Sequence, residues 1–432
     1  MNLRLFFFWL FVAFCFSEVR AQHRVILISI DGLQPAAVAD DRWPLPFLHQ
    51  FRDEGFFVPE VQSTHPSMTY PAHTTIITGV PPREHGIHCN RVFQFNRKES
   101  QLYHWYADSI RAKTLWQAVK EKGGTTASLQ WPVSTGCPYI DYNVPEYFSA
   151  VKTEVGAFNY LRPYCTPSGF LKELEEEATG RLSDTTMRAD SYEYDAKTAY
   201  MVNYIENRYK PDLLTVHFIT TDYKQHQTGP HSRETQQAFA SVDNAIGLIV
   251  ENLTYTRQLD SVTLVITGDH GFVEAQRKIY PNVWLVQAGM LSDTLGGNWQ
   301  ACFHALGAAS YLYVNPTLKL KQRKKCIEKV IRLLEQQPDS IRQWYDILTP
   351  DSIALLGGDP QADLCLSTKP GAGCGNNRTG NAFLAVKGGM HGYMTNCTPT
   401  CLILYGAKAR QNDLPEVHSL NDVFPLVEKL LK

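Results

Sequence analysis

Three short runs of mainly apolar, β-branched residues interrupt the otherwise mixed pattern of the chain. They are Arg24–Ile30 (RVILISI), Leu213–Phe218 (LLTVHF) and Val262–Thr267 (VTLVIT). Continuous apolar runs of this length are typical of strands buried on both faces of a parallel sheet. An aspartate follows each run within a few residues, namely Asp31, Asp222 and Asp269. Because ligands bind at the carboxyl ends of parallel strands, we expect a functional site where these strands end.

Between these runs, polar and apolar positions alternate with helical spacing. The spacing predicts helices over Thr114–Lys122, Ser183–Tyr209 and Arg233–Leu253, the first ending at Gly123-Gly124. Strands that alternate with helices predict an α/β fold with a doubly wound, mostly parallel sheet flanked by helices. The Gly-, Pro- and Asn-rich segment Gly357–Gly380 is expected to be an irregular loop. Residues of about 275–385 are expected to form a small cap or insertion on this core.

The N-terminus has the pattern of a cleavable export sequence. A basic residue in Met1–Arg4 precedes the apolar run Leu5–Phe16, and Val19-Arg20-Ala21 resembles a cleavage site. The run has 12 residues, whereas a membrane-spanning helix needs about 20. We therefore predict a signal peptide over residues 1–21, a mature domain over 22–432 without membrane attachment, and an exported protein. It would be periplasmic in a Gram-negative bacterium and secreted otherwise.

Cysteine spacing leaves several pairings open. Nine cysteines remain after removal of Cys15, and the pairs Cys397/Cys401 and Cys365/Cys374 are close enough in sequence for disulfides. An odd number leaves at least one thiol unpaired or bonded to another chain. No CxxC motif or zinc-finger spacing occurs.

Composition limits the classes of partner. The 432 residues are 44% apolar and 19% charged, which is ordinary for one large α/β unit or two domains. The net charge of −2 provides no basic excess of the kind that binds a phosphate backbone. We therefore expect a small-molecule partner and no nucleic-acid duplex.

Carboxylates and imidazoles recur in spacings that suit metal binding. Asp222 and His226 are four residues apart and share a face if that segment is helical. Asp269-His270 follows the third apolar run, and His391 lies among glycines in Gly388–Gly392. Taken singly, each of these residues is also compatible with a capping aspartate or a buried core histidine. Together with Asp31 they make three aspartates and three histidines, a donor set that suits Zn²⁺ and is the right number for two metals sharing one substrate.

Six short motifs, in this order along the chain, resemble those of the nucleotide pyrophosphatase/phosphodiesterases of the alkaline phosphatase superfamily. They are Asp31-Gly32, Thr69-Tyr70-Pro71-Ala72-His73, His85-Gly86-Ile87-His88-Cys89-Asn90, Asp222 to Pro230 (DYKQHQTGP), Asp269-His270-Gly271-Phe272 and Gly389-Met390-His391-Gly392-Tyr393. The resemblance covers nearly the whole mature chain and implies an alkaline phosphatase-like fold.

The resemblance also implies roles for these residues. One zinc ion would be held by Asp222, His226 and His391, and a second by Asp31, Asp269 and His270 with the oxygen of Thr69. Thr69 would be the nucleophile that forms a phosphothreonine, because metal coordination activates its hydroxyl. Asn90 would donate its amide to a phosphate oxygen. Tyr70 would pack against the substrate.

Departures from the family motifs bear on the substrate. His217 stands where the family often has a tyrosine that stacks on a nucleobase, so the resemblance assigns His217 to substrate binding. Leu129–Cys137 contains no Lys or Arg, which a monoester dianion would need, although Lys152, Arg162 or Arg277 could supply one. The expected function is hydrolysis of phosphodiester or pyrophosphate bonds in nucleotides or similar organic phosphates. The alternatives are a phosphomonoesterase of the same superfamily and a non-catalytic metal-binding relative.

Overall fold

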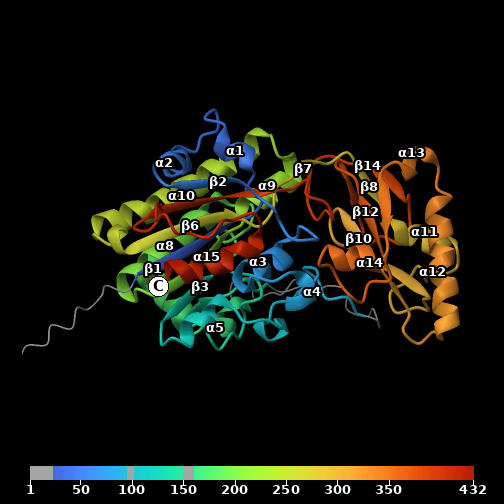
Figure 1. Ribbon diagram of the computed structural model, residues 1–432, viewed down its shortest axis with the longest axis horizontal. Helices are drawn as coiled ribbons and strands as arrows, with labels where there is room; N and C mark the ends of the chain where they lie inside the picture. The colour runs from blue at the N-terminus through green and yellow to red at the C-terminus, as the bar shows by residue number, and fades with distance from the viewer. Residues whose placement is uncertain (1–22, 95–101, 149–159) are drawn as a thin grey trace, which may run out of the picture.

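The computed structural model describes residues 23–94, 102–148 and 160–432. They form a large α/β lobe and a smaller lobe, side by side along the long axis (Figure 1). The predicted signal peptide and Lys152 lie outside the described residues. No helix in the described part of the chain is long and apolar enough to cross a membrane.

A seven-stranded sheet lies at the centre of the large lobe, with the strand order β2-β16-β6-β1-β5-β3-β4. The strands are β1 (Arg24–Ile30), β2 (Phe56–Val61), β3 (Thr126–Leu129), β4 (Tyr142–Val144), β5 (Leu213–Phe218), β6 (Val262–Gly268) and β16 (Thr400–Gly406). The five strands from β6 to β4 are parallel, whereas β16 is antiparallel to both β6 and β2. The predicted fold class is confirmed.

The three predicted strands β1, β5 and β6 are neighbours in this sheet. Their register places Ile30 opposite both Phe218 and Gly268, so all three strands end at the same level. The chain segments that follow them, beginning at Asp31, Ile219 and Asp269, therefore leave the sheet from one edge.

Helices cover both faces of the sheet. One face carries α1 (Pro35–Ala39), α2 (Pro46–Glu54), α7 (Phe170–Leu174), α8 (Tyr192–Arg208) and α10 (Arg233–Tyr255). The other face carries α3 (Thr69–Thr78), α5 (Leu115–Lys120) and α15 (Val423–Leu430). The short helices α4 (Pro82–His85) and α9 (Thr220–Thr228) lie in loops that leave the sheet.

The predicted helix Ser183–Tyr209 starts nine residues later than expected, at Tyr192. Ser183 and Thr186 hydrogen-bond each other's backbone and hydroxyl groups, which stabilises a turn in place of a helix. Ser191 then accepts a hydrogen bond from the backbone N–H of Glu193 and caps the helix. The helix predictions around α5 and α10 are confirmed within two residues.

The smaller lobe contains most of residues 277–385. A four-stranded sheet of order β11-β12-β10-β9 and a three-stranded sheet of order β13-β8-β14 form it. Its elements are β8 (Arg277–Ile279), α11 (Pro281–Gln287), β9 (Ala301–Ala305), β10 (Ala309–Val314), α12 (Leu320–Glu335), α13 (Asp339–Arg342), β11 (Tyr345–Leu348), α14 (Pro350–Leu355), β12 (Leu364–Thr368), β13 (Ala372–Cys374) and β14 (Phe383–Ala385). The short pair β7 (Val273–Glu274) and β15 (Gly389–Met390) connects it to the large lobe.

Two expectations for this region are wrong. The segment Gly357–Gly380 is not wholly irregular, because it contains β12, whose five residues are all buried between β10 and β11, and β13. The suggested disulfides are absent: none of the nine cysteines in the described part of the chain is bonded to another. Cys397 is half-buried and the others are buried, so they pack as small apolar side chains.

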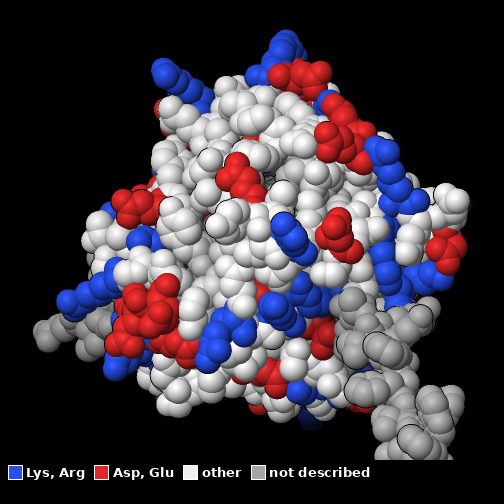
Figure 2. All heavy atoms as spheres, turned by 90° about the vertical axis from the view of Figure 1, so that its left-hand side faces the viewer, with Lys and Arg blue, Asp and Glu red and all other residues white. Residues whose placement is uncertain are grey.

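The surface has no dominant charge on the side that Figure 2 presents, which is the left-hand side of Figure 1. Lysines and arginines lie interspersed with aspartates and glutamates there, and among the described residues no patch of one sign covers this face. The distribution agrees with the near-neutral net charge of the chain.

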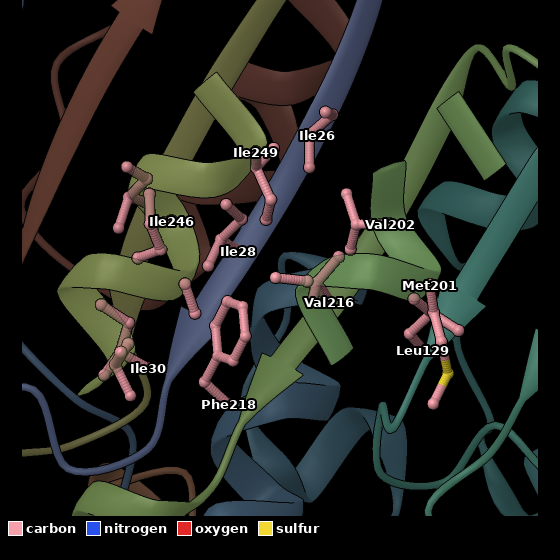
Figure 3. Packing of buried hydrophobic residues seen from close by; sticks show 14 of the residues in the cluster. Ile26, Ile28, Ile30, Leu129, Met201, Val202, Val216, Phe218, Ile246 and Ile249 are labelled. Carbon is pink, nitrogen blue, oxygen red and sulfur yellow. The ribbon is translucent and has the colours of Figure 1, made fainter. Parts of the chain in front are cut away.

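Side chains of β1 alternate between two apolar cores. Ile26, Ile28 and Ile30 pack with residues of α8 and α10, as Figure 3 shows, whereas Val25 and Leu27 pack toward α3, α5 and α15. Because a strand places successive side chains on opposite faces, burial on both faces requires the uninterrupted apolar run seen in the sequence. The buried strand holds Asp31 rigidly at its end.

Candidate active site

Three carboxylates converge at the edge where β1, β5 and β6 end. Asp31 follows β1, Asp269 follows β6, and Asp222 lies in the first turn of α9 after β5. Helix α9 is tied to the loop after β1, because Thr221 Oγ1 donates to the carbonyl oxygen of Asp31 at 2.6 Å. Gln225 Nε2 of the same helix donates to the carbonyl oxygen of Gly32 at 3.0 Å. These bonds fix the position of Asp222 relative to Asp31.

Three imidazoles face the carboxylates with their Nε2 atoms. The Nδ1 atoms of His226, His270 and His391 lie 3.1, 3.2 and 2.9 Å from the carbonyl oxygens of Gly389, Gly271 and Ser67. Because a carbonyl oxygen can only accept, each Nδ1 carries the proton. Each ring therefore has its Nε2 left to face the carboxylates, and an imidazole binds a metal ion through such a nitrogen when it carries no proton.

The six groups divide into two sets by distance. Asp31, Asp269 and His270 form one set: His270 Nε2 is 3.1 Å from Asp269 Oδ2 and 3.5 Å from Asp31 Oδ1. Asp222 Oδ1 lies 3.4 Å from His226 Nε2 and 3.5 Å from His391 Nε2. His270 is also within reach of Asp222 and His391. His226 lies beside Asp222 and His391, through the 3.4 Å contact of its Nε2 with Asp222 Oδ1.

The donor set fits divalent cations. The oxygen atoms Asp31 Oδ1, Asp222 Oδ1 and Asp269 Oδ2 and the nitrogen His270 Nε2 are all buried without a hydrogen-bond partner. The Nε2 atoms of His226 and His391 face each other at 3.0 Å. Unpartnered buried carboxylates and opposed lone pairs are costly, and a bound cation would satisfy both.

The pKa shifts of these groups also indicate that a bound cation would stabilise the site. Burial and the neighbouring charges of Asp269 and Asp222 raise the pKa of Asp31 well above its ordinary value. Burial likewise raises the pKa of Asp269. Burial and the adjacent His226 lower the pKa of His391 to about 4. Like charges and desolvation thus disfavour three bare carboxylates here, and positive charge would stabilise them.

Thr69 and Asn90 line the cavity that contains Asp31 and Asp222. Thr69 is the first residue of α3 and is 8% exposed. Asn90 Oδ1 accepts a hydrogen bond from the backbone N–H of Tyr70 at 3.0 Å. Because that donor fixes the orientation of the amide, the Nδ2 group of Asn90 remains as the donor for another partner.

His217 is buried beneath the carboxylates, although it is among the residues that border the cavity. Its Nδ1 donates to the carbonyl oxygen of Gln130 at 3.1 Å, and its Nε2 is 3.1 Å from Asp31 Oδ2. This contact requires a proton on one of the two groups. The position suits orienting Asp31 better than stacking on a nucleobase, and the substrate-binding role stays a prediction.

A cavity of about 640 Å³ opens beside Thr69 and Asn90. Aromatic rings dominate its wall: Tyr70, Tyr103, Tyr147, Phe148, Tyr194 and Tyr223. The cavity also contains Glu146, which our sequence reasoning missed. Glu146 follows the buried strand β4 by two residues, so the rule that identified the three aspartates would have found it.

Two basic residues considered for the site lie elsewhere. Arg162 forms a bidentate ion pair with Glu175, with both N···O distances at 2.7 Å. Arg277 lies in β8 of the smaller lobe, against the rings of Trp344 and Phe383. Neither is among the described residues that line the cavity.

Comparison with known proteins agrees with this architecture, which defines an alkaline phosphatase-like protein. Residues 25–394 match the family model "Type I phosphodiesterase / nucleotide pyrophosphatase". The chain therefore belongs to the type I phosphodiesterase/nucleotide pyrophosphatase family.

Two curated relatives indicate the degree of sequence similarity. Ectonucleotide pyrophosphatase/phosphodiesterase family member 3 of Mus musculus is 23% identical over 57% of this chain and 24% of its own length. Bis(5'-adenosyl)-triphosphatase ENPP4 of Bos taurus is 24% identical over 60% of this chain and 50% of its own length. The matched part of the chain thus spans a quarter to a half of these relatives.

Solved structures share the fold over nearly the full length. Murine ectonucleotide pyrophosphatase/phosphodiesterase 5 in complex with AMP superimposes with a TM-score of 0.63 at 16% identity, covering 95% of both chains. Phosphonoacetate hydrolase of Sinorhizobium meliloti 1021 in complex with phosphonoformate gives 0.68 at 18% identity, covering 95% of this chain and 96% of its own. At this identity the similarity establishes the fold alone.

Proposed function

We propose that the protein is a two-zinc hydrolase that cleaves phosphodiester or pyrophosphate bonds of nucleotides or similar organic phosphates through a phosphothreonine intermediate. One observation carries the proposal: the Nε2 atoms of three histidines and three carboxylates converge beside a threonine that lines a cavity. Family membership supports the same reaction class.

In this proposal each side chain has a separate task. Asp222, His226 and His391 would hold one zinc ion, and Asp31, Asp269 and His270 the other with the Thr69 oxygen. The bound ions would supply Lewis acidity that makes the threonine hydroxyl a nucleophile and offsets charge on the phosphoryl group. Thr69 Oγ1 attacks phosphorus, the leaving alkoxide or phosphate departs, and water then hydrolyses the phosphothreonine. Asn90 Nδ2 donates to a non-bridging oxygen as charge accumulates there.

The cavity favours a diester over a monoester. A monoester dianion carries one more negative charge than a diester and benefits from a basic side chain. Arg188 is the sole lysine or arginine among the described residues lining the cavity, and it is paired with Asp190 at 2.6 Å. A phosphomonoesterase of the same superfamily is the enzymatic alternative, and a non-catalytic metal-binding relative is the other.

A panel of three chromogenic substrates tests the assignment. We expect p-nitrophenyl thymidine 5'-monophosphate and bis-p-nitrophenyl phosphate to be hydrolysed with a higher kcat/KM than p-nitrophenyl phosphate. A preference for p-nitrophenyl phosphate would establish the monoesterase instead. If elemental analysis shows two zinc ions per chain and none of the three substrates is hydrolysed, the result would favour the non-catalytic metal-binding relative.

The expected location follows from the leader pattern of residues 1–21. We propose that the protein is exported and acts on small phosphodiesters or nucleotides outside the cytoplasm. The similar mouse protein is named as an ectonucleotide pyrophosphatase/phosphodiesterase, which supports this proposal. Mass analysis of the mature N-terminus after expression with the full leader would detect cleavage near residue 21.

A further inference from the structure

Glu146 is a cavity carboxyl group for which the proposed chemistry has no use. Its side chain is 18% exposed, and its Oε1 accepts a hydrogen bond from the hydroxyl of Tyr70 at 3.2 Å. Its Oε2 is buried 3.8 Å from His217 Nδ1, whose proton already goes to the carbonyl of Gln130. Among the described residues Oε2 has no hydrogen-bond partner.

No described basic side chain compensates this carboxyl group. It forms no ion pair with a lysine or arginine in the described part of the chain, and the nearby Arg188 of the cavity is bound to Asp190. Once Glu146 is ionised, the part of the cavity away from the proposed metal ligands therefore attracts positive charge and repels negative charge.

Aromatic rings surround this position. Tyr70 lies 5.6 Å from Tyr103, ring centre to ring centre, and Tyr103 lies 4.8 Å from Phe148. All three rings border the cavity together with Glu146. Aromatic faces stabilise a cation by their negative potential, and a buried carboxyl group forms its strongest hydrogen bonds with charged donors.

We propose that Glu146 determines specificity: it accepts a hydrogen bond from an amino or hydroxyl group on the organic part of the substrate. It favours a primary ammonium over a neutral hydroxyl and disfavours an anionic group. The inference rests on the proposed function, because it assigns the organic group that the same cavity accepts while Thr69 attacks phosphorus.

Four p-nitrophenyl phosphodiesters that differ in one substituent test this. Their second ester group is ethyl, 2-hydroxyethyl, 2-aminoethyl or carboxymethyl, and all release p-nitrophenol, so the leaving group is constant. The assays are run at about pH 9, where a carboxyl group with a pKa of about 8 is mostly ionised. In the wild type we then expect kcat/KM for the aminoethyl ester to exceed that for the ethyl ester about tenfold or more, with the carboxymethyl ester lowest.

Glu146→Gln and Glu146→Asp complete the experiment. Glu146→Gln should remove most of the aminoethyl preference, mainly through KM, and improve the carboxymethyl ester, while the ethyl ester changes less than about threefold. Glu146→Asp retains the charge and should retain part of the preference. Equal losses on all four esters, or a wild type that does not discriminate among them, would overturn the inference. A zinc-loaded wild type that hydrolyses none of the four, nor the chromogenic diesters above, would overturn the proposed function and this inference with it.

Discussion

Backbone carbonyl oxygens determine which ring nitrogen of His226, His270 and His391 faces the carboxylates. Their Nδ1 atoms are directed at Ser67, Gly271 and Gly389, which come from three different parts of the chain. The sequence identifies these histidines through their spacing from aspartates and glycines. The protonation of each ring could not be predicted, because it depends on carbonyl groups that only the folded chain brings into contact.

Thr69→Ala should abolish turnover, by about a thousandfold or more, because no neighbouring hydroxyl can take its place at phosphorus. The zinc content measured by elemental analysis should stay near two per chain, since all six proposed aspartate and histidine ligands remain. Thr69→Ser is the matched control, because it keeps a hydroxyl at the same position and should retain measurable activity. Activity of the alanine variant close to wild type would disprove the assigned nucleophile.

Glu146 also predicts a pH dependence of stability. Burial raises its pKa from 4.5 to about 8, so the folded state keeps a proton that the unfolded state has already released. The resulting stabilisation is present below pH 4.5 and is lost as pH rises toward about 8. In chelator-treated protein we expect Tm to fall between about pH 6.5 and 8.5, a range above the ordinary pKa of histidine.

Glu146→Gln is the control for that experiment. The amide cannot titrate, so the decrease in Tm over this range should be smaller in the variant than in the wild type. An unchanged slope would show that Glu146 does not carry the shifted proton.

At the level of elements, long apolar runs were predictable and polar turns were not. The strands β1, β5 and β6 end within one residue of their predicted ends. Burial on both faces requires a continuous apolar run, so the ends of the run mark the ends of the strand. The start of α8 was missed because side-chain hydrogen bonds in residues 183–186 override helical spacing. Strand β12 was missed because glycines and prolines around it dominate the local composition.

Two adjacent glycines let β15 approach α9. At Gly388, where φ is +105°, a Cβ atom would lie 2.1 Å from the backbone oxygen of His226. Gly388→Ala should therefore push the segment carrying His391 away from the helix carrying Asp222 and His226. We expect loss of one zinc equivalent by elemental analysis and at least a tenfold fall in kcat/KM.

Gly380→Ala provides the comparison for this variant. Gly380 has φ of +88° and nothing within 4 Å of an added Cβ, so the substitution brings backbone strain without a clash. Its zinc content should equal that of the wild type. Equal zinc loss in both variants would attribute the effect to strain rather than to the close approach.

At the scale of the molecule, the two lobes meet at the segment that carries Asn90. The ring of Phe93 stacks on Tyr313 of β10, with centroids 4.1 Å apart. His304 of β9 donates through Nε2 to the carbonyl oxygen of Arg91 at 3.0 Å. The smaller lobe thus contacts the segment that carries Asn90, whereas the six proposed aspartate and histidine ligands all lie outside β8 to β14.

Phe93→Ala should loosen this contact and lower kcat more than it raises KM, because Asn90 acts most strongly when charge develops on the phosphoryl oxygens. We expect kcat to decrease tenfold to hundredfold while the zinc content stays unchanged. Phe93→Leu keeps most of the apolar contact, so its kcat should lie between that of the wild type and that of Phe93→Ala. A fall in zinc content equal to the fall in kcat would place the effect at the metal ligands instead.

The antiparallel strand β16 has a consequence for when the protein becomes active. It comes last in the chain among the strands of the central sheet, yet it lies between β6 and β2 and is the partner of β2 in the described sheet. Strand β2 leads directly into α3 and Thr69. During synthesis from the N-terminus, β2 has no partner strand in the described sheet until residues 400–406 emerge. Under the proposed function, a chain that ends before residue 400 should lack hydrolytic activity, because β2 then has no partner strand in the described sheet.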